Sequence, residues 1–206
     1  MPRNLEGKTP AIEDCHCAPA RSGFQSTQTI MSENLDPELQ FIFGRRSIRR
    51  FAPGEVGEGA IDKLLQAAMA APSAAASDPW RFIVVRNRTT LEKLAAALPF
   101  GGMLTQSSVG FVVCGDIEAA HDRQLSYLLQ DCSAAIENLL LCAHALGLGG
   151  CWLGVHPRED RMEKLKAILS IPHSVIPVSA VAIGLPGERK EPRTRFKAGY
   201  VHRESW

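Results

Sequence analysis

The sequence predicts one layered domain of the α/β or α+β class, built from alternating helices and strands. Two observations carry this prediction: apolar residues recur at helical spacing in several segments, and short β-branched and aromatic runs lie between those segments. A chain of 206 residues with 45% hydrophobic and 22% charged residues has the length and composition of a globular domain with one core.

Helices are expected where apolar residues repeat every three or four positions between capping or breaking residues. Asp36 precedes the first such segment, and Pro72 follows the second. Thr89 and Glu92 form a capping-box pattern in the third, and Gly147 closes the fourth. The expected helices cover residues 37–43, 58–71, 89–98, 125–146 and 157–168.

Strands are expected in the short apolar runs between these helices, at residues 81–85, 109–114, 151–155 and 178–183. The apolar segments also carry cysteines, which we expect to be buried free thiols in a reducing compartment. These cysteines are Cys114, Cys132, Cys142 and Cys151.

The first segment of the chain differs from the rest. Residues 1–34 contain proline and glycine without apolar periodicity, so we expect a disordered leader before a domain of residues 35–206. Met31 is an alternative start of the chain. Cys15, His16 and Cys17 lie in the leader, but a metal site needs about four ligands and no second cluster completes the set. We therefore predict no metal site.

The expected helix at residues 125–146 is apolar on more than one face. Leu128, Cys132 and Ile136 belong to one stripe, whereas Leu129 and Leu141 lie off it. Such a helix must be buried on more than one side. A domain of this size can bury it alone, and a dimer interface is the equally good alternative.

A dense cationic segment precedes the second helix. Arg45, Arg46, Arg49 and Arg50 surround Ser47 within six residues. Guanidinium groups can bind a phosphate in a bidentate way, and a serine hydroxyl adds a further hydrogen bond. The alternative is a solvated basic patch. Because the net charge of the chain is only +1, the segment suits a small phosphorylated ligand better than a nucleic acid.

Three further segments are candidates for ligand contact. The loop around Pro72, Ser73 and Ala74 has small side chains that would let backbone approach a flat ligand, although it could be a plain connector. Gly150 and Cys151 follow a helix and open a strand, the reverse of the order in dinucleotide-binding fingerprints. That turn could offer backbone N–H groups to a ring or simply be tight. A second cationic segment, at residues 190–196 near the C-terminus, carries Lys190, Arg193 and Arg195, although such basic runs are usually solvated.

Other chemistries lack their signatures. The sequence has no zincin motif, no nucleophile elbow and no phosphate-binding P-loop. No apolar run is long enough to span a membrane, and no secretory signal is recognisable, so we expect a cytoplasmic protein without membrane or nucleic-acid partners.

Four segments, taken in order, resemble the FMN-dependent nitroreductase family. They cover about residues 36–206. The segments are RRSIRRF at residues 45–51, PSA…PW at residues 72–80, the helix containing Gln130 and Asp131 that runs into GLGGCWLG at residues 147–154, and the ending HRESW at residues 202–206.

This resemblance implies an α+β fold with a central, mostly antiparallel sheet surrounded by helices in an intertwined homodimer. It implies FMN at the dimer interface and an oxidoreductase that passes reducing equivalents from NAD(P)H to nitro compounds, quinones or related acceptors by a ping-pong mechanism. The flavin carries the electrons in such an enzyme, so no catalytic side chain is named.

The resemblance also assigns cofactor-binding residues. Arg45, Arg46, Ser47 and Arg49 would hold the FMN phosphate and ribityl chain, with added positive charge from Arg193 and Arg195. Pro72, Ser73 and Ala74 would contact the isoalloxazine ring from the other protomer. Gly150 and Cys151 would present backbone N–H groups to flavin N5, so a side chain at Gly150 is expected to impair hydride transfer more than stability.

The sequence departs from the family pattern at two positions of the ring-contact loop. Ala76 stands where asparagine is common, and Asp78 where glutamine is common. Asp78 would face the acceptor pocket or cap the next strand. The alternative functions are a specialised reaction on the same fold, such as dehalogenation or flavin chemistry, and a non-catalytic dimer that stores flavin or mediates interactions.

Overall fold

The computed structural model describes residues 37–206. The leader expected at residues 1–34, with Cys15, His16, Cys17 and Met31, lies outside the described residues, as does the expected cap Asp36.

The sheet is antiparallel in every strand pair of the described residues. Strand β5 is central: it pairs with β3, which pairs with β2, and it also pairs with β4 and β1. The contact with β1 involves Leu185 and Pro186, beyond the residues of β5 that pair with β3 and β4. The strands are β1 (Phe51–Ala52), β2 (Trp80–Val85), β3 (Val109–Asp116), β4 (Gly149–Gly154) and β5 (Val175–Pro186).

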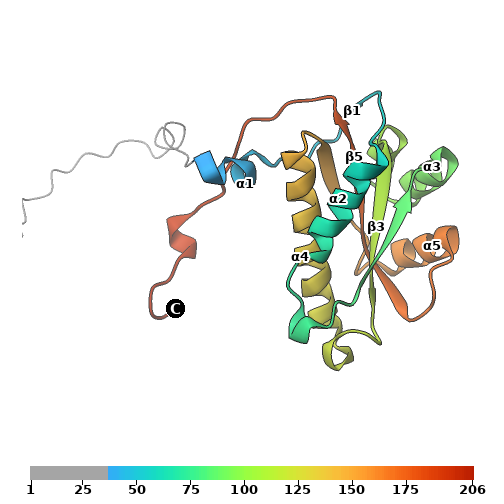
Figure 1. Cartoon of the computed structure of the whole chain (residues 1–206). Coiled ribbons are helices and arrows are strands. Elements are labelled where there is room, and N and C mark those ends of the chain that lie inside the picture. The colour runs from blue at the N-terminus through green and yellow to red at the C-terminus, as the bar shows by residue number, and fades with distance from the viewer. Residues whose placement is uncertain (1–36) are drawn as a thin grey trace, which may run out of the picture. The chain divides into compact units, whose positions relative to one another are not determined.

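Helices cover both faces of this sheet. Figure 1 shows α2 and α4 on one side and α3 and α5 on the other. The α-helices are α1 (Gln40–Gly44), α2 (Glu58–Met69), α3 (Arg88–Ala97), α4 (Leu125–Ala145) and α5 (Glu159–Leu169). Short 3-10 helices are η1 (Pro37–Leu39), η2 (Ala74–Ala76), η3 (Gly101–Thr105), η4 (His121–Arg123) and η5 (Ala198–Tyr200).

The core lies in two layers because the sheet is buried on both faces. In β3, Phe111 and Val113 belong to the cluster that includes α2 and α4, whereas Val112 and Cys114 belong to the cluster that includes α3 and α5. All four side chains are fully buried. This explains why β3 is a continuous apolar run rather than an alternating one.

The predicted α+β fold with its antiparallel sheet is confirmed, and every expected helix and strand is present within a few residues of its predicted bounds. Strand β1 was not expected. The predicted capping box at Thr89 and Glu92 is wrong. The Asn87 side chain caps α3 by accepting a hydrogen bond of 3.0 Å from the Thr90 N–H, so that the helix begins one residue before Thr89.

Helix α4 shows how one chain buries an apolar helix on several sides. Leu140 is buried, and Leu129 and Cys142 pack against the core cluster shared by α2 and α4. Asn138 adds a hydrogen bond of 3.1 Å from its Nδ2 to the carbonyl of Ala67 in α2. Much of the apolar surface that suggested a dimer is therefore covered within the chain.

The cysteines of the described residues are free thiols, as predicted. Cys114, Cys132 and Cys151 are buried, but Cys142 is only partly buried, which corrects one expectation. Desolvation raises the pKa of Cys114 and of Cys132 from the usual 9.0 to about 12 in each case. Both thiols are therefore neutral in the folded protein at physiological pH.

These two thiols predict destabilisation by alkali. Above pH 9 the unfolded chain loses the thiol protons that the folded chain keeps up to about pH 12. The free energy of unfolding should therefore fall as pH rises, by at most about 1.4 kcal/mol per pH unit and thiol. Urea denaturation under reducing conditions at pH 8 and pH 10 measures this fall. A double variant Cys114→Ala and Cys132→Ala should lose less stability across that range, and an equal loss would refute the assignment.

Candidate functional site

The two cationic segments meet because β1 pairs with β5. Phe51 lies opposite Pro186, and Ala52 lies opposite Leu185. The segment before β1 and the segment after β5 therefore lie side by side at the same end of this strand pair, and they run antiparallel to each other.

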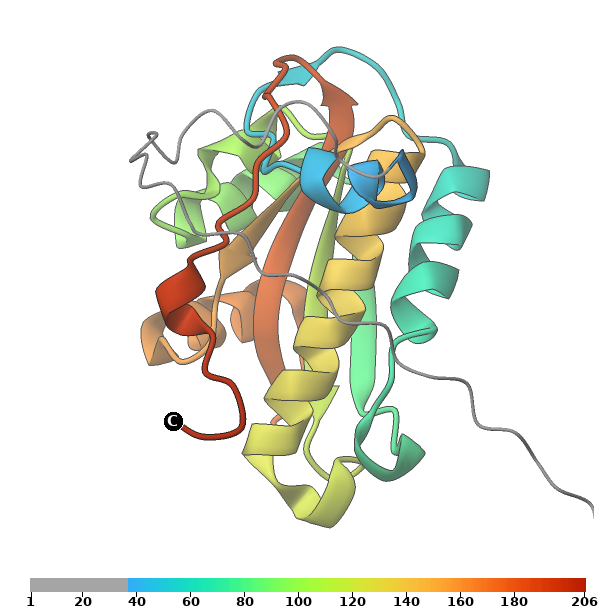
Figure 2. The same cartoon turned by 90° about the vertical axis from the view of Figure 1, so that its left-hand side faces the viewer.

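Backbone hydrogen bonds continue the pairing of the two segments beyond the strands, in the same register at Gly187 and one residue out of that register at Arg193. The N–H of Gly187 donates to the Arg50 carbonyl at 2.8 Å, and farther along the N–H of Arg193 donates to the Phe43 carbonyl at 3.0 Å. We call residues 43–50 and 187–195 together the cationic ribbon. Figures 1 and 2 show both of its segments passing the C-terminal end of α4.

The cationic ribbon encloses a pocket of about 390 Å³. Six of the lining residues are positively charged, one is a serine, and none carries a carboxylate. The lining residues are Arg45, Arg46, Ser47, Arg49, Lys190, Arg193 and Arg195. The structure thus brings together every residue that the sequence assigned to phosphate binding, although those residues come from opposite ends of the domain.

Lys190 also lines the pocket, although the sequence analysis assigned only the arginines of its cationic segment to phosphate binding. Its ammonium group lies 2.6 Å from the Ser47 carbonyl and 3.0 Å from Glu188 Oε1. Its place opposite Ser47 follows from the register of β1 on β5.

Two of the pocket's cations have an acidic partner. Arg45 Nε lies 2.9 Å from Glu137 Oε1 of α4, and Lys190 pairs with Glu188. Arg46 donates instead to the backbone carbonyl of Glu191. Among residues 37–206, no carboxylate forms an ion pair with the remaining arginines of the pocket, which are Arg49, Arg193 and Arg195. The pocket therefore has an excess of positive charge and favours an anion.

Glu188 lies where the two segments of the cationic ribbon meet. Its Oε1 accepts hydrogen bonds from the Arg49 N–H at 2.6 Å and the Arg50 N–H at 3.3 Å, besides the contact with Lys190. The Arg49 N–H, followed by the Lys190 ammonium, holds the pKa of Glu188 below its ordinary value. The carboxylate is therefore ionised in neutral solution.

Gly150 and Cys151 lie beside the cationic ribbon. Gly150 forms a parallel bridge with Ser47, and the Ile48 N–H donates to the Gly150 carbonyl at 2.9 Å. Cys151 is buried, and desolvation raises the pKa of its thiol although Arg49 and other nearby donors oppose the shift. The start of β4 is therefore next to the cationic pocket, as the assignment of both residues to one ligand site requires.

The expectation that a side chain at Gly150 would disturb a ligand but spare the fold is wrong. A Cβ built there lies 2.8 Å from Leu140 Cδ2 and 2.9 Å from Ile183 Cδ1. Both of these side chains belong to the core cluster of α4 and the sheet. The pleat of β4 directs this position into the core, and the sequence alone does not determine which face that is.

The loop with Pro72, Ser73 and Ala74 lies away from the pocket of the same chain. The Ala74 N–H donates to Asp131 Oδ1 at 3.0 Å, which ties the loop to the N-terminal half of α4. In Figures 1 and 2 this loop and the cationic ribbon lie at opposite ends of α4. One chain therefore does not bring its own loop to its own pocket.

The same loop has an unusual backbone. Ala75, Ala76 and Asp78 have φ angles of 51°, 52° and 47°, in the left-handed region that alanine and aspartate rarely adopt. The Asp78 carboxylate is hydrogen-bonded to the Ser73 hydroxyl, whose oxygen in turn accepts from the Asp78 N–H at 3.1 Å. Asp78 therefore closes the loop on itself.

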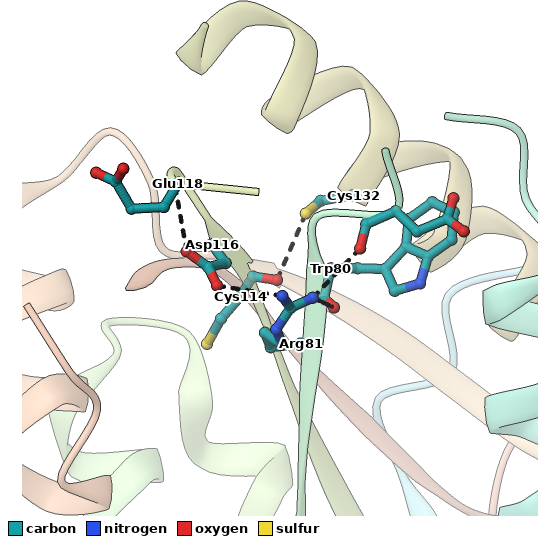
Figure 3. A network of polar contacts seen from close by, with 7 residues as sticks. Trp80, Arg81, Cys114, Asp116, Glu118 and Cys132 are labelled. Carbon is teal, nitrogen blue, oxygen red and sulfur yellow. Dashed lines mark hydrogen bonds and ion pairs between the residues drawn. The ribbon is translucent and has the colours of Figure 1, made fainter. Parts of the chain in front are cut away.

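Arg81 fastens the end of this loop to the sheet. Its guanidinium donates to the carbonyls of Asp78 and Trp80 at 3.2 and 2.8 Å and to Asp116 Oδ2 at 3.1 Å (Figure 3). The Asp116 N–H donates to the Pro79 carbonyl at 2.8 Å. An arginine inside an apolar strand was the sequence signal for this role.

Two polar atoms near the loop are buried without a hydrogen-bond partner in the described part of the chain. They are Oδ2 of Asp131 and Oγ of Ser77. Buried polar atoms of this kind are commonly satisfied by water or a ligand.

Residues 37–206 contain no group of acidic, histidine or cysteine side chains that could hold a metal ion. None of the described helices is both long and apolar enough to cross a bilayer.

Comparison with known proteins places this arrangement among related folds. Residues 42–99 and 99–185 match the model of the Nitroreductase family. A Methanothermobacter thermautotrophicus protein, provisionally named an NADH dehydrogenase/NAD(P)H nitroreductase, is 45% identical over 82% of this chain and 87% of its own length.

Solved structures give the same result. The crystal structure of a Bacteroides thetaiotaomicron protein with the same provisional name is 36% identical, with a TM-score of 0.78 over 84% of this chain and 100% of that one. A provisionally named nitroreductase from Desulfovibrio desulfuricans, solved in complex with FMN, is 31% identical, with a TM-score of 0.72 over 84% of this chain and 99% of that one.

Gly150→Val should destabilise the fold, because its side chain would overlap Leu140 and Ile183. We expect a loss of about 1–3 kcal/mol in the free energy of unfolding, as for other overpacked cores. Gly154→Ala in the same strand is the matched control, since its Cβ meets nothing within 4 Å. Chemical denaturation of both variants measures the difference. Equal stability of Gly150→Val and wild type would contradict the packing described above.

Proposed function

The chain belongs to the nitroreductase family, and on this premise we propose that the pocket of the cationic ribbon binds the phosphate of FMN. The protein is accordingly an oxidoreductase that uses FMN with NAD(P)H. The observation that carries the assignment of the pocket is its set of six cationic side chains around one hydroxyl.

The chemistry of the pocket fits a phosphate monoester. Such a group carries a charge of about −1.5 to −2 at neutral pH and presents three acceptor oxygens. Only two of the six lining cations have a carboxylate partner among the described residues, so positive charge remains for the ligand. Arginine guanidinium groups and the Ser47 hydroxyl supply donors with the geometry that phosphate oxygens accept.

We place the isoalloxazine ring between Gly150 and Cys151 of one protomer and Pro72, Ser73 and Ala74 of the other. The separation of the loop and the pocket along α4 supports a homodimer in which each protomer completes its partner's site. Exposed apolar side chains on α1 and on the C-terminal segment, Phe41, Ile42, Phe196 and Tyr200, would be covered in such a dimer.

When bound, FMN supplies the redox chemistry, accepting a hydride from NAD(P)H and passing reducing equivalents to a second substrate. The chain's own contribution is binding and orientation: no residue lining the pocket is a carboxylate or a histidine, so none is assigned as an acid or base. The second substrate is proposed to be a nitro compound, a quinone or a related small acceptor. It would occupy the site after NAD(P)⁺ has left, in a ping-pong order.

The visible spectrum of the purified protein tests the cofactor, since oxidised flavin absorbs near roughly 370 and 450 nm. Anaerobic stopped-flow reduction with NADH and with NADPH then tests the activity and assigns the donor. Loss of the longer-wavelength band on mixing with either nicotinamide supports the proposed oxidoreductase. A bound flavin that neither donor reduces would favour the flavin-storage alternative.

Arg45→Ala should weaken FMN binding, because it removes a cation that lines the pocket. We expect a loss of about ten- to a hundredfold in affinity, the worth of one charge-assisted hydrogen bond. Arg50→Ala removes the same charge from the same segment at a position that does not line the pocket, and it should have little effect. Equilibrium titration with FMN distinguishes the two, and equal affinities would exclude this pocket as the phosphate site.

The shared site predicts complementation between two defective variants. Arg45→Ala impairs the phosphate pocket, and Ala74→Trp should block the ring contact of the partner. Co-expression with two affinity tags yields a heterodimer with one intact and one doubly altered site, which should retain about one FMN per dimer. Each homodimer should retain far less. A heterodimer as poor in FMN as both parents would refute a site built from two protomers.

A further inference from the structure

Glu188 is an acidic group in a region otherwise built to hold an anion. Its side chain is 18% exposed, and one oxygen, Oε1, accepts from the Arg49 N–H, the Arg50 N–H and the Lys190 ammonium. A carboxylate so near a phosphate site would by charge alone repel the ligand. Its presence there calls for a structural reason.

The contacts of Lys190 indicate the structural reason for a carboxylate at this place. Two of the three donors of its ammonium group are engaged, one with the Ser47 carbonyl at 2.6 Å and one with Glu188 at 3.0 Å. These contacts connect residues 187–195 to residues 43–50 through side chains at the level of the pocket. Glu188, through the Arg49 and Arg50 N–H groups, and Lys190, through the Ser47 carbonyl, thus cross-link the two segments.

The contacts of Glu188 and Lys190 oppose electrostatic repulsion between the two cationic segments. Six cationic side chains gather around one pocket, and like charges at such short range repel one another. Residues 187–195 have few other attachments to residues 43–50 within the described chain: the Gly187 N–H donates to the Arg50 carbonyl, Arg46 donates to the Glu191 carbonyl, and the Arg193 N–H donates to Phe43. Without an ionised group at Glu188, the repulsion would separate the segments and move Arg193 and Arg195 away from Ser47.

We propose that Glu188 is a positioning residue of the phosphate pocket, which holds the two segments of the cationic ribbon together so that their arginines converge on one phosphate. The proposal rests on the function given above for the identity of the ligand. Glu188 does not contact the ligand; it acts through Arg49, Arg50 and Lys190.

A positioning role for Glu188 and a purely electrostatic role predict opposite changes in phosphate affinity when Glu188 is removed. If Glu188 were only a charge near the pocket, its removal would strengthen phosphate binding. If it positions the ribbon, its removal weakens phosphate binding although the pocket becomes more positive. The sign of the effect therefore decides between them.

The test compares Glu188→Gln and Glu188→Ala with the control Glu191→Gln. The control removes one negative charge from the same segment but keeps the backbone carbonyl that Arg46 uses. Each full-length variant is titrated with FMN and with riboflavin, which lacks the phosphate, and its melting temperature is measured alongside.

We expect Glu188→Ala to weaken FMN binding about tenfold and Glu188→Gln to weaken it less, as one charge-assisted hydrogen-bond network is lost. Riboflavin affinity should be unchanged, so the preference for FMN over riboflavin shrinks. Glu191→Gln should bind FMN as the wild type does or more tightly.

Unchanged or tighter FMN binding by both Glu188 variants overturns the proposal, as does an equal loss of FMN and riboflavin affinity. The result for Arg45→Ala separates this failure from that of the proposed function. If Arg45→Ala weakens FMN binding and the Glu188 variants do not, the pocket stands and only the role of Glu188 falls. If the wild type does not prefer FMN to riboflavin, the phosphate pocket itself is wrong.

Discussion

The pairing of β5 with β1 is the constraint on which the rest of the site depends. It involves only two residue pairs, yet it fixes the register of the chain on either side. The backbone hydrogen bond of Gly187 with Arg50 continues that register, and a slip of one residue precedes the hydrogen bond of Arg193 with Phe43. Strand β5 is itself held by β3 and β4, so the position of the cationic ribbon is set by the buried centre of the sheet. The strength of the anion site comes from charge, but its shape comes from apolar packing several residues away.

The helices and the longer strands could be predicted from the sequence because their signals are local. Apolar spacing locates α4, and Gly147, with a φ of 72°, ends it as expected. Strand β1 could not be predicted in this way, since two residues carry no periodicity. Its existence depends on the last residues of β5, which lie more than a hundred positions later in the chain.

The residues of the candidate site likewise fall into those with a local sequence signal and those without one. Clustered arginines predicted a phosphate site, and the structure brings all of them except Arg50 together around one cationic pocket. Lys190 was recognisable only as part of a cationic segment and Glu188 was not recognisable, because both acquire their roles only when the register places them opposite Ser47 and Arg49. The error at Gly150 has a related cause: a residue type can indicate a turn, but the direction of its missing side chain depends on pairing with Ile183.

The register of the cationic ribbon also limits which sequence changes the pocket can tolerate during evolution. A substitution at Arg193 or Arg195 alters one donor and leaves the others in place. An insertion or deletion of one residue between Pro186 and Lys190 would instead shift every later partner at once, separating Lys190 from Ser47 and the following arginines from the pocket. Connecting segments at the surface ordinarily tolerate changes in length. This segment has no regular secondary structure beyond β5 and nevertheless has its length fixed, so variation among related chains should accumulate here in residue type and not in residue number.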